Sequence, residues 1–170
     1  MLSGKGQLHT GAISVSVRHM KDMAASVQAR GGPVEEAIAE HTRETIRSGH
    51  IVPGYGHAML RGEDARLTLV LRFIDMQAKE ALNQKKSEAG GSLKTETLEL
   101  IIKSIGVVPE VLKKEVPKMK SPSPNVDALS GSLFWAMGLH EDYSLLMLLC
   151  GRGMGCGALY LWDRGESAQF

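Results

Sequence analysis

Apolar side chains recur every three or four residues along most of the chain, which is the spacing of one face of a helix. The first such segment, residues 33–48, opens with a proline, which a first helical turn tolerates, and stops at a glycine. The second, residues 64–85, has an apolar stripe formed by Leu67, Leu71, Ile74, Ala78 and Leu82. Alternation of apolar and polar residues, which indicates strands, is nearly absent. The pattern therefore predicts a helix in each segment.

Prolines and glycines divide the second half of the chain. Residues 93–105 regain helical spacing as far as Gly106, and a separate short helix is expected after Pro109. Proline cannot continue a helix and restricts the residue before it, so an extended backbone is expected up to residue 127. The residues that impose it are Pro117, Pro122 and Pro124.

Helical spacing resumes over residues 128–137 and again over 142–164. A further helix is expected just after His9, where small residues follow. The predicted fold class is all-α. In such a chain the chemistry belongs in loops at helix ends, because those loops can direct polar groups that a packed helix face cannot.

The composition fits a globular chain with a core and adds no general charge. Of 170 residues, 43% are hydrophobic, and 20 basic against 19 acidic side chains leave a formal charge of +1. No net positive field is present to attract nucleic acid or an anionic membrane, so neither is expected as a partner. The longest uninterrupted apolar run, Leu145–Cys150, is far shorter than the roughly 20 residues that span a bilayer.

The two cysteines and a run of glycines share the last predicted helix. Cys150 and Cys156 lie in an apolar segment without another cysteine or a nearby histidine to complete a zinc set, which predicts reduced, packed thiols and no metal. Residues 151–157 alternate glycine with other residues, but no strand precedes them as a dinucleotide-binding loop requires. Close packing between helices is the preferred explanation of these glycines.

Two loops carry the strongest candidates for chemistry. In Ile51–His57, two glycines flank a tyrosine and allow a sharp turn and close approach to a ligand, with His57 at the exit. Arg66, at the start of a predicted helix, suits a small carboxylate. In Pro122–Asp127, an extended proline segment leads to Asp127 at a helix start, where an aspartate is either a helix N-cap or a catalytic base.

Taken together, these motifs resemble the citrate synthase family, most closely its mitochondrial form. The residues that carry the resemblance are His9 before a small-residue helix start, then Pro-Gly-Tyr-Gly-His-Ala-Met-Leu-Arg (53–61) and Pro-Asn-Val-Asp-Ala-Leu-Ser-Gly (124–131). It extends through Ser-Gly-His-Ile-Val (48–52), Cys-Gly-Arg (150–152) and Leu-Trp-Asp-Arg (161–164), and so covers essentially the whole chain.

The resemblance implies an acyltransferase that condenses acetyl-CoA with oxaloacetate to give citrate and CoA. Asp127 is expected to remove a proton from the acetyl methyl group, while His9 donates a hydrogen bond to the thioester oxygen. His57 is expected to hydrogen-bond the ketone oxygen of oxaloacetate, and Arg66 and Arg152 to bind its carboxylates. No metal or cofactor is implied, because acetyl-CoA is a substrate.

The same resemblance assigns the CoA side of the site to backbone and cations near the two loops. The expected contacts are Ile51, Val52, Gly54, Gly56 and Asn125, with Arg61 and Lys120 as phosphate partners. It also implies a homodimer, and a location in the mitochondrial matrix, or in the cytoplasm for a bacterial protein. Residues 1–21 contain no acidic side chain and loosely resemble a transit peptide, but glycines interrupt the amphipathic pattern.

Several departures from the family pattern leave alternatives open. Thr10 and Ile13 intrude beside His9, and Asp64-Ala65-Arg66 lacks the usual central proline. One residue is missing between Gly138 and Arg152, and its loss is expected to rotate the arginine off its usual face. The chain corresponds to less than the C-terminal half of a citrate synthase, so a fragment or a chain that needs a partner is expected. A non-catalytic CoA-binding or interaction module and a methylcitrate synthase are the alternative functions.

The resemblance also predicts the domain organisation. Residues 1–9 are expected to be a remnant of the large domain, 10–131 the small helical domain on the acyl-CoA side, and 132–170 helices that return to an incomplete large domain. Without that domain, the last helix is expected to expose Leu145, Leu146, Leu148 and Leu149.

Overall fold

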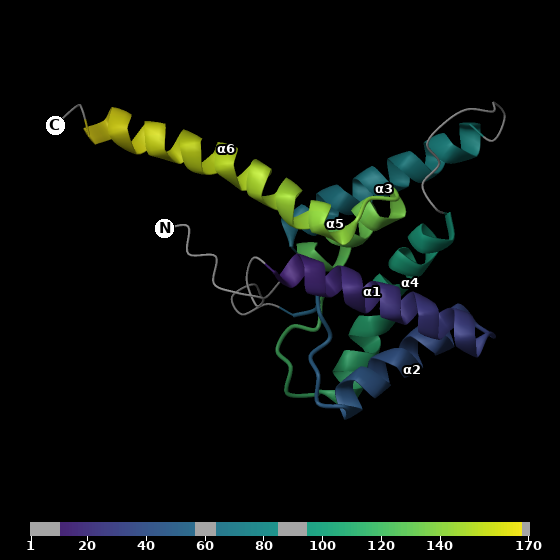
Figure 1. The fold of residues 1–170 in the computed structure, drawn as a ribbon. Coiled ribbons are helices and arrows are strands. Elements are labelled where there is room, and N and C mark those ends of the chain that lie inside the picture. The colour runs from purple at the N-terminus through teal and green to yellow at the C-terminus, as the bar shows by residue number, and fades with distance from the viewer. Residues whose placement is uncertain (1–10, 57–63, 85–94, 168–170) are drawn as a thin grey trace.

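The computed structural model describes residues 11–56, 64–84 and 95–167, and within them the protein consists of six helices joined by loops (Figure 1). The helices are α1 (Ala12–Arg30), α2 (Val34–Arg47), α3 (Ala65–Gln84), α4 (Thr95–Glu115), α5 (Val126–Ala136) and α6 (Glu141–Ser167). The described chain has no named strand, only an isolated bridge between Tyr55 and Pro124. The predicted all-α class is confirmed.

Local sequence accounts for the boundaries of the first two helices. α1 ends where Gly31 adopts φ +64°, and Gly32 follows at φ +77°, a backbone region that suits glycine. Pro33 precedes the first residue of α2. Glu35 and Glu36 lie in its first turn, where their negative charges stabilise the positive end of the helix dipole. The predicted helices over 33–48 and 64–85 match α2 and α3 within two residues.

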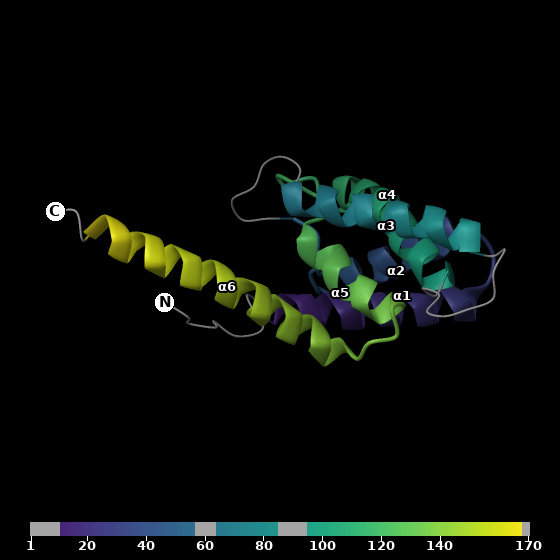
Figure 2. The same cartoon turned by 90° about the horizontal axis from the view of Figure 1, so that it is seen from above.

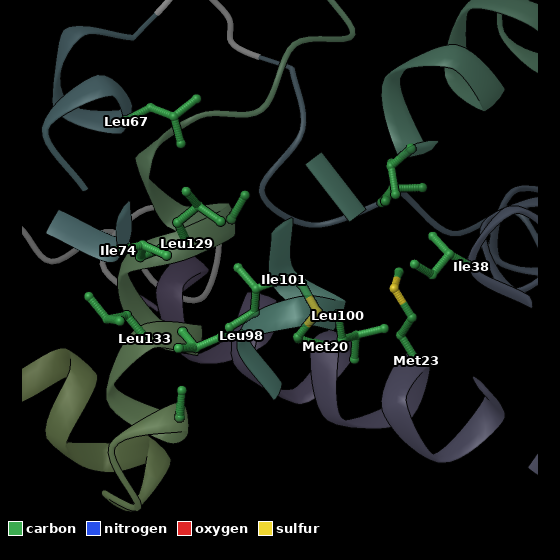
Figure 3. Close-up of a cluster of buried hydrophobic side chains, with 14 of the residues drawn as sticks. Met20, Met23, Ile38, Leu67, Ile74, Leu98, Leu100, Ile101, Leu129 and Leu133 are labelled. Atoms are coloured by element: carbon green, nitrogen blue, oxygen red, sulfur yellow. The ribbon is translucent and has the colours of Figure 1, made fainter. Parts of the chain in front are cut away.

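The five helices from α1 through α5 share a single apolar core (Figure 3). Its fully buried members come from different helices: Met23 from α1, Ile38 from α2, Ile101 from α4 and Leu129 from α5. Burial of one such side chain contributes roughly 1.5–3 kcal/mol. This core fixes the orientation of α5, whose first turn carries Asp127.

α4 corrects the expectation of two short helices. It runs without interruption from Thr95 to Glu115, with Pro109 inside it. The buried stripe continues across the proline, since Ile101, Val108 and Leu112 all face the core. Burial of this stripe outweighs the single backbone hydrogen bond that a proline removes.

The polar face of α1 is less solvated than its sequence indicates. Arg18 and Lys21 both bind Glu141 at the start of α6, at 3.2 and 2.8 Å. His19 lies mostly buried against His41 of α2, with ring centroids 5.1 Å apart. These three side chains therefore join α1 to two other helices.

α6 projects away from the other helices in both views (Figures 1 and 2). Leu146 and Leu149 are exposed as expected, whereas Leu145 and Leu148 are half-buried near the base of the helix. The prediction of packed thiols is wrong, because Cys150 and Cys156 are free and exposed. The glycine explanation fails as well, since a Cβ added at any glycine over 151–157 would meet nothing within 4 Å in the described chain.

By length and composition, α6 is also the one described helix that could cross a membrane, over Glu141–Gly165 with a mean hydropathy of 1.4. The uninterrupted apolar run Leu145–Cys150 is short, but the glycines that follow it do not break the helix. Length and composition alone are weak indications of a span. The expected boundary between residues 131 and 132 falls inside α5, and the division into domains stays a prediction.

Candidate functional site

The two loops singled out from the sequence lie against each other. Gly56 donates its backbone N–H to the carbonyl oxygen of Ser123 at 2.9 Å, and Asn125 donates its own to the carbonyl oxygen of Gly54 at 2.9 Å. The Asn125 side-chain amide donates to the carbonyl oxygen of Gly56 at 2.8 Å. Segments about 70 residues apart in sequence thus form one rigid unit at the start of α5.

Both glycines of the first loop are required by geometry. Gly54 has φ +82°, and a Cβ at this position would lie 2.6 Å from the Cα of Ala128 in α5. Gly56 has φ +83°, and a Cβ there would lie 2.5 Å from the Cε of Met119. At Gly54 the loop therefore approaches α5 more closely than any side chain there would allow. At Gly56 it lies against the segment that precedes α5.

Tyr55 and Val52 anchor the loop to the helical core. The Tyr55 hydroxyl donates a long hydrogen bond of 3.4 Å to Ser104 Oγ of α4, and its burial raises the pKa of Tyr55 to about 12. Val52 is 6% exposed and belongs to the core, whereas Ile51 is 73% exposed. Ile51 and Val52 are both expected to contact CoA through their backbone. Only Ile51 also presents its side chain to solvent.

Asn125, and not Asp127, caps α5. The Oδ1 atom of Asn125 accepts a hydrogen bond from the backbone N–H of Asp127 at 2.9 Å, as an N-cap side chain does. The reading of Asp127 as the N-cap is therefore wrong, because Asp127 is already the second residue of the helix. The charge of the Asp127 carboxylate raises the pKa of Arg66, after the larger effect of Asp64.

Asp64 holds Arg66 next to the start of α5. Its carboxylate is 4% exposed and accepts hydrogen bonds from Arg66 Nε at 2.9 Å, Arg66 Nη2 at 2.8 Å and the backbone N–H of Val126 at 3.1 Å. Hydrogen bonding by Arg66, followed by smaller backbone contributions, lowers the pKa of Asp64 to about 2. A permanently ionised pair thus lies between α3 and α5.

Apart from Ile51 and Val52, the predicted site residues fall into three groups. Gly54, Gly56, Asn125, Asp127 and Arg66 come together around the start of α5. Lys120 is exposed in the segment between α4 and α5, between two residues that border Gly56, and Arg152 is exposed on the projecting part of α6. The remaining three, His9, His57 and Arg61, lie outside the described residues, and their convergence with Asp127 stays a prediction.

Asp64 is the functional neighbour that sequence reasoning missed. The sequence marked Asp64-Ala65-Arg66 only as a motif that keeps its charges and lacks a proline. The missing proline is compensated, because Asp64 Oδ1 accepts the backbone N–H of Arg66 at 3.0 Å and so caps α3. An aspartate two residues before an arginine at a helix start was the available signal.

The described residues offer an anion site and no metal site. No group of three or more His, Cys, Asp or Glu side chains that could hold a metal occurs among them. Arg66, more than half exposed at 55%, beside the positive ends of α3 and α5, can receive a carboxylate. The nearby Asp127 carboxylate can accept a proton from a bound molecule.

Comparison with known proteins finds similarity over most of the chain. The family model described as citrate synthase, C-terminal domain, matches residues 1–169. A probable mitochondrial citrate synthase of Glossina morsitans morsitans is 37% identical over 138 residues, covering 81% of this chain and 26% of the relative.

Two fungal relatives match more of the chain. The mitochondrial 2-methylcitrate synthase of Fusarium solani is 33% identical over 160 residues, and the mitochondrial citrate synthase 3 of Saccharomyces cerevisiae is 32% identical over 160 residues. Each match covers 94% of this chain and about 30% of the relative (31% and 30%). The chain therefore spans less than a third of the length of these relatives.

Proposed function

The chain belongs to the citrate synthase family, and from this premise we propose that it supplies the catalytic base and a carboxylate-binding arginine for the condensation of acetyl-CoA with oxaloacetate. The products are citrate and free CoA. The observation that carries the proposal is the pairing of the two loops through Asn125 and Gly56 at 2.8 Å. This pairing brings Asp127 close to Gly56, the residue directly before His57.

Asp127 acts as the base in this proposal. It takes a proton from the acetyl methyl group, and the resulting carbon nucleophile forms a bond with the ketone carbon of oxaloacetate. A carboxylate with a pKa near 3.9 is a weak base for a carbon acid, so the developing oxygen charge must be stabilised at the same moment. His9 is proposed to donate that hydrogen bond, which is typically worth roughly 3–4 kcal/mol.

Oxaloacetate is held and polarised from the other side. His57 is proposed to donate a hydrogen bond to its ketone oxygen, which becomes the hydroxyl group of citryl-CoA. Arg66 is proposed to bind one carboxylate, because a guanidinium makes paired contacts that a lysine cannot copy. Hydrolysis of the thioester then releases citrate and CoA. Asn125, the backbone of residues 51–56, Arg61 and Lys120 remain the proposed CoA contacts.

Arg152 requires a larger assembly to take part. It lies on the exposed length of α6, the helix that projects away from the others. We propose that the additional two thirds or more of the relatives' length, in a longer chain or in a partner such as a second subunit, packs on α6 and brings Arg152 to the oxaloacetate carboxylates. The mitochondrial matrix is the proposed location, because the three relatives are named as mitochondrial enzymes, and none supports the cytoplasmic alternative.

A second candidate substrate is propionyl-CoA. The match to the Fusarium solani 2-methylcitrate synthase, over 94% of this chain, favours this candidate as much as the match to citrate synthase 3 favours acetyl-CoA. The two functions share the proposed base and differ only in the acyl group of the thioester. The isolated position of Arg152 favours the remaining alternative, a non-catalytic module that binds CoA.

The decisive experiment measures CoA thiol release by the purified chain, with acetyl-CoA or propionyl-CoA and oxaloacetate, beside CoA binding by calorimetry. Asp127→Asn should abolish condensation and keep CoA binding. Asp142→Asn is the matched control, since Asp142 is likewise the second residue of its helix. Condensation by Asp127→Asn would refute Asp127 as base, and CoA binding without turnover in the unaltered chain would show that this chain alone binds CoA without catalysing the condensation.

His57→Ala separates the substrates. It should weaken use of oxaloacetate far more than binding of CoA, because the imidazole is proposed to contact only the ketone. Equal losses of both would indicate a folding defect and would remove support for this role.

A further inference from the structure

One buried carboxylate connects two helix starts and an arginine. Asp64 Oδ1 accepts the backbone N–H of Arg66 at 3.0 Å and its Nε at 2.9 Å. Oδ2 accepts Arg66 Nη2 at 2.8 Å and the backbone N–H of Val126 at 3.1 Å. Arg66 is the second residue of α3 and Val126 the first residue of α5, so the same side chain satisfies an otherwise unpaired donor at both helix ends.

This arrangement exceeds what helix capping needs. A serine or threonine at position 64 could cap α3, and Asn125 already caps α5. A side chain that reaches Arg66 and Val126 together needs two acceptor oxygens at the distance of a carboxylate. Burial of a charge is costly unless it is paired, and here the pair is complete.

We propose that Asp64 is a positioning residue, which fixes the guanidinium plane of Arg66 and its distance from the first turn of α5, where Asp127 lies. The inference rests on the proposed function, in which Arg66 binds an oxaloacetate carboxylate and Asp127 is the base. Asp64 itself touches no substrate in this proposal.

One edge of the Arg66 guanidinium binds Asp64, and the rest of the group is accessible to a ligand. Asp64 occupies Nε and Nη2, while 55% of the Arg66 side chain remains exposed. A substrate carboxylate can approach the N–H groups that point away from Asp64. A free arginine samples many rotamers, so an arginine held along one edge loses less conformational entropy when it binds.

The first test needs no substrate. In nitrogen-15 NMR spectra, the Arg66 Nε–H signal, assigned by its loss in Arg66→Lys, should exchange slowly with water in the unaltered chain. Asp64→Asn keeps the shape of the side chain and removes its charge, and it should make this exchange at least about 10-fold faster. Arg72→Gln, an exposed position one and a half turns further along α3, should leave it unchanged. Fast exchange in the unaltered chain would overturn the proposal even if Asp64→Asn failed to fold.

The second test measures function. With a chain or assembly that turns over, Asp64→Asn should raise the KM for oxaloacetate at least about 10-fold and leave the KM for acetyl-CoA within about twofold, because only the orientation of Arg66 is lost. Equal changes in both constants, or none, would overturn the positioning role. If the unaltered chain neither binds nor uses oxaloacetate, the proposed function fails, and the exchange rate of Arg66 alone decides the role of Asp64.

Discussion

The side-chain amide of Asn125 donates a hydrogen bond to the carbonyl oxygen of Gly56 at 2.8 Å, across 69 positions of sequence. The Oδ1 atom of the same side chain accepts the backbone N–H of Asp127. One residue therefore fixes the first loop to the second and begins the helix that carries the proposed base. A loop without regular secondary structure gains a defined position in this way.

Asn125→Ala should remove both interactions and lower the free energy of unfolding by about 2 kcal/mol, roughly half from the cap and half from the hydrogen bond to Gly56. Asn125→Ser keeps an acceptor for the cap but is too short to reach Gly56, and it should lose only about 1 kcal/mol. Urea unfolding at pH 7 gives both values. Equal losses in the two variants would mean that the contact with Gly56 contributes nothing.

Gly54→Ala should be more damaging than a change of backbone preference alone explains. The new methyl group would meet Ala128 at 2.6 Å in addition to the strain at φ +82°, for a total loss of about 2–4 kcal/mol. Gly32→Ala is the matched control, since φ is +77° and nothing lies within 4 Å of the added Cβ. It should lose only about 1–2 kcal/mol in the same urea experiment. Similar losses would refute close packing of the loop against α5.

The sequence predicted the elements whose pattern depends on local spacing. The helices over 33–48 and 64–85 have one apolar stripe facing the core, and the structure places α2 and α3 there. The break expected at Pro109 was wrong, because a local rule cannot weigh one lost hydrogen bond against a stripe that stays buried from Ile101 to Leu112.

The candidate site was predictable by motif but not by geometry. The motifs identified Asn125 and Asp127 and left Asp127 as either a helix N-cap or a catalytic base, and the hydrogen bond from the Asp127 backbone N–H to Asn125 Oδ1 decides against the cap. Asp64 escaped notice because its partner Val126 is 62 residues away. The contact between His19 and His41 was not predictable either, since the sequence of one helix does not say which residue of another packs on it.

Acid should destabilise the contact between α1 and α2. Burial, with the nearby His41, lowers the pKa of His19 to about 4, and burial also lowers that of His41, which Asp22 and Glu44 partly oppose and Arg30 adds to. Neither Nε2 has a hydrogen-bond partner among the described residues. Between pH 6.5 and about 4 the unfolded chain binds more protons than the folded one, so stability is complete above pH 6.5 and falls as pH is lowered.

Urea unfolding at a series of pH values tests this sign. His19→Phe should flatten the loss of stability between pH 6.5 and 4, whose slope for one histidine is at most about 1.4 kcal/mol per pH unit. His50→Gln, at an exposed position, should leave the slope as it is. An unchanged slope in His19→Phe would show that the buried imidazole pair does not control the acid sensitivity.

Beyond its base, α6 exposes most of its large apolar side chains to solvent. Leu159 and Leu161 are 68% and 71% exposed, and a soluble monomer rarely presents a large continuous apolar surface. The purified chain should therefore associate or bind detergent, and Leu159→Gln with Leu161→Gln should shift sedimentation towards the monomer. The free energy of unfolding should change by less than about 0.5 kcal/mol, because exposed residues contribute little to the fold. Leu129→Ala in the core is the opposite control and should lose about 2–5 kcal/mol. If the double variant loses as much stability as Leu129→Ala, α6 is packed in solution and its exposed position is wrong.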